Sequence, residues 1–335
     1  MRISVKAIPV HEVMNDLANQ WQVPLVENCG EMSLELPEDL GKGRIKGMGF
    51  ESGIGIINYE CKFHSDYEIL FSVKQNHPLK FIFSSVGSVN HAFEGDGVLR
   101  EIKTYQNVVV SSSGTKGHLL QFKAGEKNNI LSIEIVRSVF SKRKNHDFSD
   151  LDPVLGALFR DAAAVKNFVY QGNYCIKAAD IVDEIYRNNY EGMLRSVFME
   201  GKILEMLVTQ IRQYQDDHRE DEMPQMIRTS DMEKVKMAAE LINVQMDKNF
   251  SVEHLANEVG TNVNKLQEGF KQLYGLTVNK YAQEVKLKAA RELLISSELS
   301  VAEVVTSIGL NHASYFSRIF REKYGMNPGF FQKPG

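Results

Sequence analysis

The spacing of hydrophobic positions changes along this chain of 335 residues. Between about residue 25 and residue 140, short runs rich in Val, Ile, Phe and Tyr alternate partly with polar positions, which predicts β-strands. The runs are GIGIINYECKF (53–63), DYEILFSV (66–73), LKFIFSSVGSV (79–89), NVVVSSS (107–113), HLLQFKA (118–124) and ILSIEIV (130–136). Many short strands separated by polar turns predict a barrel or a sandwich.

After residue 148 apolar residues recur at steps of three and four, which is the helical period. The segments are 152–165, 176–188 and 193–215, and the last carries a long apolar stripe of Val197, Ile203, Leu204, Leu207, Val208 and Ile211. Residues 216–229 are polar and acidic and contain a proline, so we expect a linker there. The predicted organisation is α+β: a β-rich domain (1–148), a helical extension (149–215), the linker, and an all-α domain (230–335).

The all-α domain contains a repeat. SVEHLANEVG (251–260) resembles SVAEVVTSIG (300–309), and FKQLYG (270–275) and FREKYG (320–325) follow at nearly equal distances. In each unit a serine, Ser251 or Ser300, is placed to cap a short helix, and a glycine, Gly260 or Gly309, is placed to end it. A second helix follows in each unit, near 262–274 and 311–324. Short helix, glycine turn and longer helix predict two helix-turn-helix units.

The outer face of each second helix carries polar side chains. These are Asn264, Gln267, Glu268 and Lys271 in the first unit, and Ala313, Ser314, Ser317, Arg318 and Arg321 in the second. Amides and hydroxyls suit the edges of bases, and lysine and arginine suit phosphate or guanine. We therefore predict that both faces read DNA in the major groove.

The segment that joins the two units, residues 277–297, predicts one continuous helix, with Tyr281, Val285, Ala289, Leu293 and Leu294 on one side. A helix of about 20 residues is roughly 30 Å long, and the DNA helical repeat is about 34 Å. One chain could then place its two second helices in successive major grooves.

Charge gives little further guidance. The whole chain carries a formal charge of −4, whereas residues 231–335 hold 13 lysines and arginines against 12 acidic residues. A basic DNA-binding surface would have to come from placement on one face. The three cysteines are far apart, the N-terminus has no apolar signal region, and no run of 18 apolar residues occurs. We expect a cytoplasmic protein with no membrane contact.

The C-terminal part resembles the DNA-binding domain of the AraC/XylS family of transcription regulators over about residues 231–333. The motif GLNHASYFSRIFREKYGMNPGFF (309–331) carries the resemblance, with KLKAARELL (286–294) in the joining helix. Two residues depart from the family pattern. Lys286 stands where arginine is usual, and Glu268 stands where arginine or lysine is frequent. Gly269, next to Glu268, is unfavourable inside a helix.

The resemblance implies a bacterial regulator of promoters that binds double-stranded DNA. It also implies a homodimer formed through the N-terminal region, a cupin-like effector domain that takes a small molecule, and RNA polymerase as a candidate partner. The N-terminal part is similar in kind to the siderophore-responsive branch of the family, a likeness that names no ligand.

An enzyme of the cupin kind is the first alternative. His64, His77, His91 and His118 lie in the β-rich part, but no H-x-H pair and no common catalytic motif occurs. We expect no catalytic residue, no cofactor and no bound metal, with these histidines as isolated core or surface residues. The second alternative is a helical-repeat adaptor that binds proteins, for which the outer faces are too polar.

Overall fold

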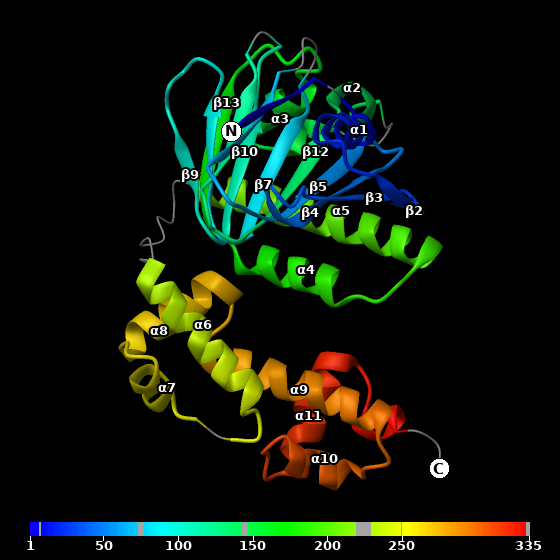
Figure 1. Ribbon diagram of the computed structural model, residues 1–335. Coiled ribbons are helices and arrows are strands. Elements are labelled where there is room, and N and C mark those ends of the chain that lie inside the picture. The colour runs from blue at the N-terminus through cyan, green and yellow to red at the C-terminus, as the bar shows by residue number, and fades with distance from the viewer. Residues whose placement is uncertain are drawn as a thin grey trace. The chain divides into compact units, whose positions relative to one another are not determined.

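The computed structural model describes residues 1–6, 8–72, 77–114, 116–142, 147–218, 229–248 and 250–332. The chain divides into two compact units, residues 1–223 and 224–335 (Figure 1). The expected linker falls largely outside the described residues, because 219–228 are not described.

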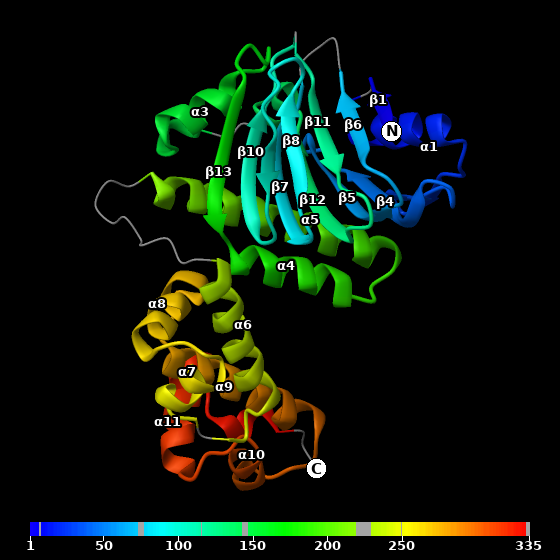
Figure 2. The ribbon, with the colours of Figure 1, turned by 60° about the vertical axis from the view of Figure 1, so that its left-hand side comes forward.

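The first unit is built on two β-sheets. The described strands form one sheet in the order β1 (Arg2–Val5), β6 (Tyr67–Phe71), β11 (His118–Phe122), β8 (Val89–Phe93) and β9 (Arg100–Ile102). The other runs β13 (Phe168–Tyr174), β10 (Gln106–Ser111), β7 (Leu79–Val86), β12 (Asn128–Ile135), β5 (Ile54–Phe63), β4 (Gly41–Gly49), β3 (Glu31–Glu35) and β2 (Val26–Asn28). Figure 2 shows the strands of this unit from the side.

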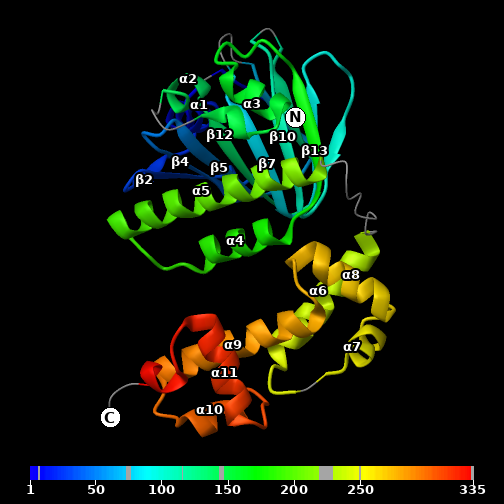
Figure 3. The ribbon, with the colours of Figure 1, turned by 180° about the vertical axis from the view of Figure 1, so that it is seen from behind.

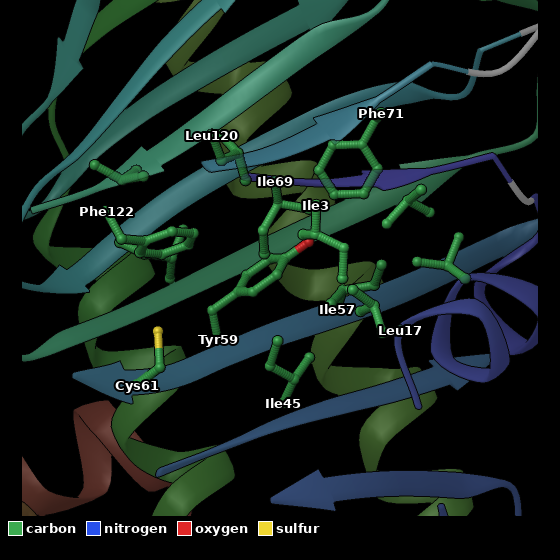
Figure 4. Packing of buried hydrophobic residues seen from close by; sticks show 14 of the residues in the cluster. Ile3, Leu17, Ile45, Ile57, Tyr59, Cys61, Ile69, Phe71, Leu120 and Phe122 are labelled. Atoms are coloured by element: carbon green, nitrogen blue, oxygen red, sulfur yellow. The ribbon is translucent and has the colours of Figure 1, made fainter. Parts of the chain in front are cut away.

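A hydrophobic core fills the space between the two sheets. Ile69, Leu120 and Phe122 from one sheet pack with Ile57 and Tyr59 from the other (Figure 4). Alternation along each strand sends every second side chain into this space. Helix α1 (Val10–Trp21) contributes its buried face to the same core.

A second core lies on the other face of the larger sheet. Helices α2 (Arg137–Phe140), α3 (Pro153–Arg160), α4 (Ile176–Arg187) and α5 (Gly192–Asp217) cover this face, and a short 3-10 helix, η1 (Phe148–Asp150), precedes α3. Figure 3 shows α5 crossing the strands of the larger sheet, with α4 beside it. The central strands β5, β7, β10 and β12 are therefore buried on both faces, as a sheet covered by helices requires.

The second unit is helical. It consists, among the described residues, of α6 (Thr229–Val244), α7 (Val252–Glu258), α8 (Val263–Tyr274), α9 (Val278–Ser296), α10 (Val301–Ser307), α11 (Ala313–Tyr324) and the 3-10 helix η2 (Pro328–Phe331). The α+β class predicted from the sequence is confirmed, and both helix-turn-helix units form where the repeat predicts them. A cupin-like barrel stays a prediction.

Three local predictions were wrong or incomplete. Residues 168–174 lie in the expected helical extension but form β13, because they pair with β10 at the edge of the sheet. The first 25 residues, for which no element was predicted, contain β1 and α1. The residues of the predicted apolar stripe lie on two faces of α5: Ile203 and Leu207 are buried, whereas Val197 and Val208 are exposed.

Candidate nucleic-acid interface

The first helix-turn-helix unit is α7 followed by α8. The Ser251 hydroxyl accepts a hydrogen bond from the His254 amide at 3.1 Å, and the Asn262 side chain accepts one from the Lys265 amide at 2.8 Å. Both caps satisfy amides that a helix start leaves unpaired. Gly260, with φ 69°, supplies the turn between the two helices. The predicted cap and stop signals are confirmed here.

The second helix-turn-helix unit, α10 and α11, repeats the serine cap and the glycine turn, while His312 at the start of α11 makes no side-chain cap. Ser300 and Glu303 form a reciprocal capping box at the start of α10. Gly309 takes φ 69° in the turn. Phe316, Ile319 and Phe320 are buried in the core that α11 shares with α9 and α10. The opposite face of α11 therefore points away from this core and is exposed.

The residues predicted to read DNA lie on these outward faces. Exposed side chains are Asn264, Glu268 and Lys271 on α8, and Ala313, Ser314, Arg318 and Arg321 on α11, while Gln267 and Ser317 are partly exposed. The structure thus brings the predicted residues of each unit together on one helix surface.

Several of these side chains already have local partners. The Gln267 side-chain oxygen accepts from the Val278 amide at 3.2 Å, so it holds the start of α9. The Glu268 carboxylate accepts from Gln272 at 2.9 Å. The Arg318 guanidinium lies 5.6 Å from the ring centre of Tyr315, a cation–π arrangement that holds it over the helix surface.

Helix α9 joins the two units. It has 19 residues, which corresponds to about 28 Å at 1.5 Å per residue. The buried positions are Val278, Lys286, Leu287, Ala290 and Leu294, so the buried face lies partly beside the stripe predicted from the sequence. The buried face differs from the predicted stripe because α9 packs against helices of both helix-turn-helix units, and this packing needs apolar residues on two sides of α9.

Lys286, a departure from the family pattern, lies between the two helix-turn-helix units. Its side chain is buried, and its ammonium group donates to the Gly309 carbonyl at 3.4 Å. Burial lowers the pKa of Lys286, and the Asp247 carboxylate opposes that effect. An added Cβ at Gly309 would lie 1.8 Å from the Asp247 carbonyl oxygen. The turn that follows α6, the middle of α9 and the turn between α10 and α11 therefore come together at one point.

Three of the four histidines named in the β-rich domain contradict the expectation of isolated residues, whereas the fourth, His64, is exposed. The ring centres of His91 and His118 are 5.4 Å apart, and His77 lies 6.4 Å from His118. All three are buried. Burial lowers the pKa of His91 to about 4 and that of His118 well below its usual value. His91 and His118 alternate with buried apolar residues on the paired strands β8 and β11, a signal that the sequence contained.

These histidines form no metal centre in the part of the chain that is described, where no group of three or more His, Cys, Asp or Glu side chains could hold a metal ion. Among the same residues, no helix is both long and apolar enough to cross a membrane.

Two helix-turn-helix units joined by one long helix, following a β-rich domain along the chain, define an AraC-type regulator. A family model described as a helix-turn-helix domain matches residues 255–334. A second, described as the regulatory protein PchR N-terminal domain, matches residues 42–226, which is more than half of the chain. The chain therefore belongs to the PchR family of AraC-type regulators. That family consists of transcription regulators rather than enzymes.

Individual relatives match over shorter stretches. The chain is 32% identical over 110 residues to the regulatory protein PchR of Pseudomonas aeruginosa, covering 33% of this chain and 37% of the relative. It is 30% identical over 98 residues to the bifunctional transcriptional activator and DNA repair enzyme AdaA of Bacillus subtilis, covering 28% and 46%. The matches thus span less than half the length of these relatives.

A solved transcriptional regulator from Chromobacterium violaceum, described as an AraC-type DNA-binding domain protein, is 25% identical. The match covers 32% of this chain and all of that one, with a TM-score of 0.30.

Proposed function

We propose that this protein is a sequence-specific DNA-binding regulator of transcription, in which α8 and α11 enter successive major grooves of one operator. The observation that supports the proposal is the pair of exposed polar faces on α8 and α11, the second helices of the two helix-turn-helix units that α9 joins. Polar and cationic side chains on such a face can reach base edges and phosphates. The domain boundaries predicted from the sequence, with DNA binding assigned to 230–335, are part of this proposal.

The two faces contribute unequally. On α11, Ser314, Ser317 and Arg318 are the candidate base readers, and Arg321 is placed for phosphate. On α8, Asn264 is the candidate base reader and Lys271 the phosphate contact. The Gln267 side-chain oxygen already accepts a hydrogen bond from the Val278 amide at the start of α9. The Glu268 carboxylate is repelled by phosphate, though it could accept a hydrogen bond from cytosine. We therefore expect α11 to dominate specificity.

Binding to the DNA upstream of the protein's own gene tests the proposal. We expect saturable binding that prefers this fragment over a scrambled one, with affinity falling steeply as salt rises because counterions are released. Equal affinity for both fragments, or none for either, would favour the adaptor alternative.

The assembly we propose is a homodimer formed through α5. Met193, Val197, Leu204 and Val208 lie along one side of this helix at steps of four and seven residues and are exposed, Met193 by 73% and Val197 by 63%. Gly201 falls within this run, and no atom lies within 4 Å of where its Cβ would be. A second copy of the same helix could bury the stripe, since helical spacing puts these residues on one face. We call this set the α5 stripe.

The regulation we propose follows from the two-unit organisation. A small effector binds in the first unit and changes the population of its helix arrangements, and so the dimer that presents the DNA-binding units. Such a protein would act in the cytoplasm, beside the chromosome, with RNA polymerase as a candidate partner.

A further inference from the structure

A cavity of about 150 Å³ lies between the outer face of the larger sheet and the helix pair α4–α5. One part of its lining is apolar and comes from both layers: Met48, Ile56 and Leu131 from the sheet, and Val182, Ile185 and Met199 from the helices. A dry cavity of about this size can accommodate one aromatic ring. The cavity is separate from the core between the two sheets.

The other part of the lining is charged. The Arg195 guanidinium of α5 donates to Glu31 at 3.0 Å, and the Lys46 ammonium lies 3.2 Å from the other oxygen of Glu31. On the neighbouring strands, Arg44 donates to Glu60 at 3.2 Å. Three cations thus face two carboxylates, and one positive charge is left over. Desolvation raises the pKa of Glu31, but Arg195 and Lys46 outweigh it and hold that pKa below its ordinary value.

Asn58 adds a second, independent feature. It is 8% exposed and lines the cavity between the charged and apolar parts. Its side-chain nitrogen donates to Glu60 at 3.1 Å. Its side-chain oxygen has no hydrogen-bond partner among the described residues. A buried acceptor left unpaired is destabilising, so such an atom calls for a donor.

The polar groups of the cavity link the sheet to the helices. Arg195 reaches from α5 to β3, and the Tyr186 hydroxyl of α4 donates to Asn129 of β12 at 2.8 Å. A ligand here would contact α4, α5 and the sheet together. It would therefore favour the arrangement in which α5 is docked on the sheet, and α5 also carries the α5 stripe.

We propose that this cavity is the effector site, and that it takes a small organic acid carrying one aromatic ring or a short chain and a hydroxyl or amino donor. The carboxylate meets the surplus positive charge of Arg44, Lys46 and Arg195. The donor pairs with the Asn58 oxygen once the amide turns toward it, since that oxygen is shielded from solvent in the empty cavity. The apolar part packs against the apolar residues of the sheet and the helices. This inference rests on the proposed function only in calling the ligand an effector.

Ligand binding to the full-length protein, measured by calorimetry, tests the site with three matched probes. Mandelate carries the acid, the hydroxyl and the ring, phenylacetate lacks the hydroxyl, and mandelamide lacks the charge. We expect saturable binding of mandelate, and binding of each of the other two weaker by about tenfold or more, because one hydrogen bond to a charged or buried group is lost. No binding of mandelate, or equal binding of all three, would overturn the proposal.

Variants localise the site. Arg44→Gln with Lys46→Gln should weaken mandelate binding by about tenfold or more, since two of the three cations are removed. Lys42→Gln, on the same strand with an exposed side chain outside the lining, should leave it unchanged. Asn58→Ala should abolish the preference for mandelate over phenylacetate. Equal loss in the double variant and the Lys42 control would overturn the assignment.

Binding of each variant to operator DNA without ligand, together with its melting temperature, completes the experiment. A protein that binds mandelate but no DNA would refute the proposed function and leave the site standing. One that binds DNA but no mandelate would refute the site alone.

Discussion

Gly309 ends the short helix of the second helix-turn-helix unit under two constraints, of which Gly260, its counterpart in the first, shares only one. Both glycines have φ 69°. At Gly309 a Cβ would also collide with the backbone of Asp247, whereas nothing lies within 4 Å of the corresponding point at Gly260. Gly269, inside α8, is also explained by packing, since its Cβ would lie 2.3 Å from a methyl group of Val235. Helix propensity alone would have disfavoured it.

Replacing each turn glycine by alanine separates the two constraints. Gly260→Ala should lower the free energy of unfolding by about 1–2 kcal/mol, the cost of a side chain in the left-handed region. Gly309→Ala should cost about 1–3 kcal/mol more, because the backbone must move to relieve the overlap. Urea unfolding of both variants measures the difference, and equal losses would contradict the close approach to Asp247.

Arg318 is the side chain on α11 best placed to read a base. Arg318→Ala should weaken operator binding by about 1–3 kcal/mol and relax the preference at one base pair. Lys323→Ala is the matched control, because Lys323 lies on the same helix but pairs with Glu284 of α9. Anisotropy titrations of both variants against the same operator decide the point, and equal losses would remove Arg318 from the interface.

His91 makes the first unit sensitive to acid. Its pKa is lowered from 6.5 to about 4 by burial, so the unfolded chain binds more protons than the folded one between those values. The free energy of unfolding therefore keeps its full value above pH 6.5 and decreases as the pH falls. The contribution of His91 to this decrease is about 2–3 kcal/mol near pH 4.5. Urea unfolding of the wild type and of His91→Leu at pH 7 and pH 4.5 should show a smaller pH effect in the variant. An identical pH effect would contradict the assignment.

Among the elements, α5 has two apolar faces, of which one is buried against the sheet and the other is exposed. Ile203 and Leu207 pack against the sheet, and the α5 stripe is exposed. The sequence showed a single long apolar stripe, since periodicity cannot tell a face buried within the chain from one that awaits another chain.

Val197→Lys should therefore weaken dimer formation by about tenfold or more without lowering monomer stability, because the charge enters the proposed contact and leaves the folded core alone. Val154→Lys on α3, where Val154 is 50% exposed, is the control. Sedimentation analysis gives the dimer affinity. A dimer of unchanged strength would place the interface elsewhere.

The elements predicted from the sequence are those with strong local signals. β5, β7, β10, β11 and β12 carry clear runs of β-formers, and the helices from α7 to α11 are marked by capping residues, glycine stops and the repeat. β4 has four glycines in GKGRIKGMG and few β-formers, and its pairing with β3 and β5 keeps it in the sheet. β13 depends on pairing with β10, which lies far earlier in the sequence. The outward faces of α8 and α11 were predictable from period and polarity. The hydrogen bond of Gln267, the contacts of Lys286 and the histidine cluster depend on tertiary packing, so local sequence patterns could not predict them.

At the scale of the whole molecule, the chain consists of two units with separate cores. This organisation predicts that residues 224–335 bind operator DNA on their own, while the response to an effector requires the first unit. DNA-binding titrations of the full chain and of this fragment, with and without mandelate, check the division. A fragment whose DNA affinity still changed with mandelate would contradict it.

The central claim is that α9 holds α8 and α11 at a fixed separation, so that one chain reads two successive major grooves. The most direct test is the affinity of the protein for operators in which the spacing between the two half-sites is varied. Inserting about five base pairs, half a helical turn, should lower affinity by tenfold or more, and about ten should not restore it in full because α9 cannot lengthen. The same affinity at every spacing would contradict the account.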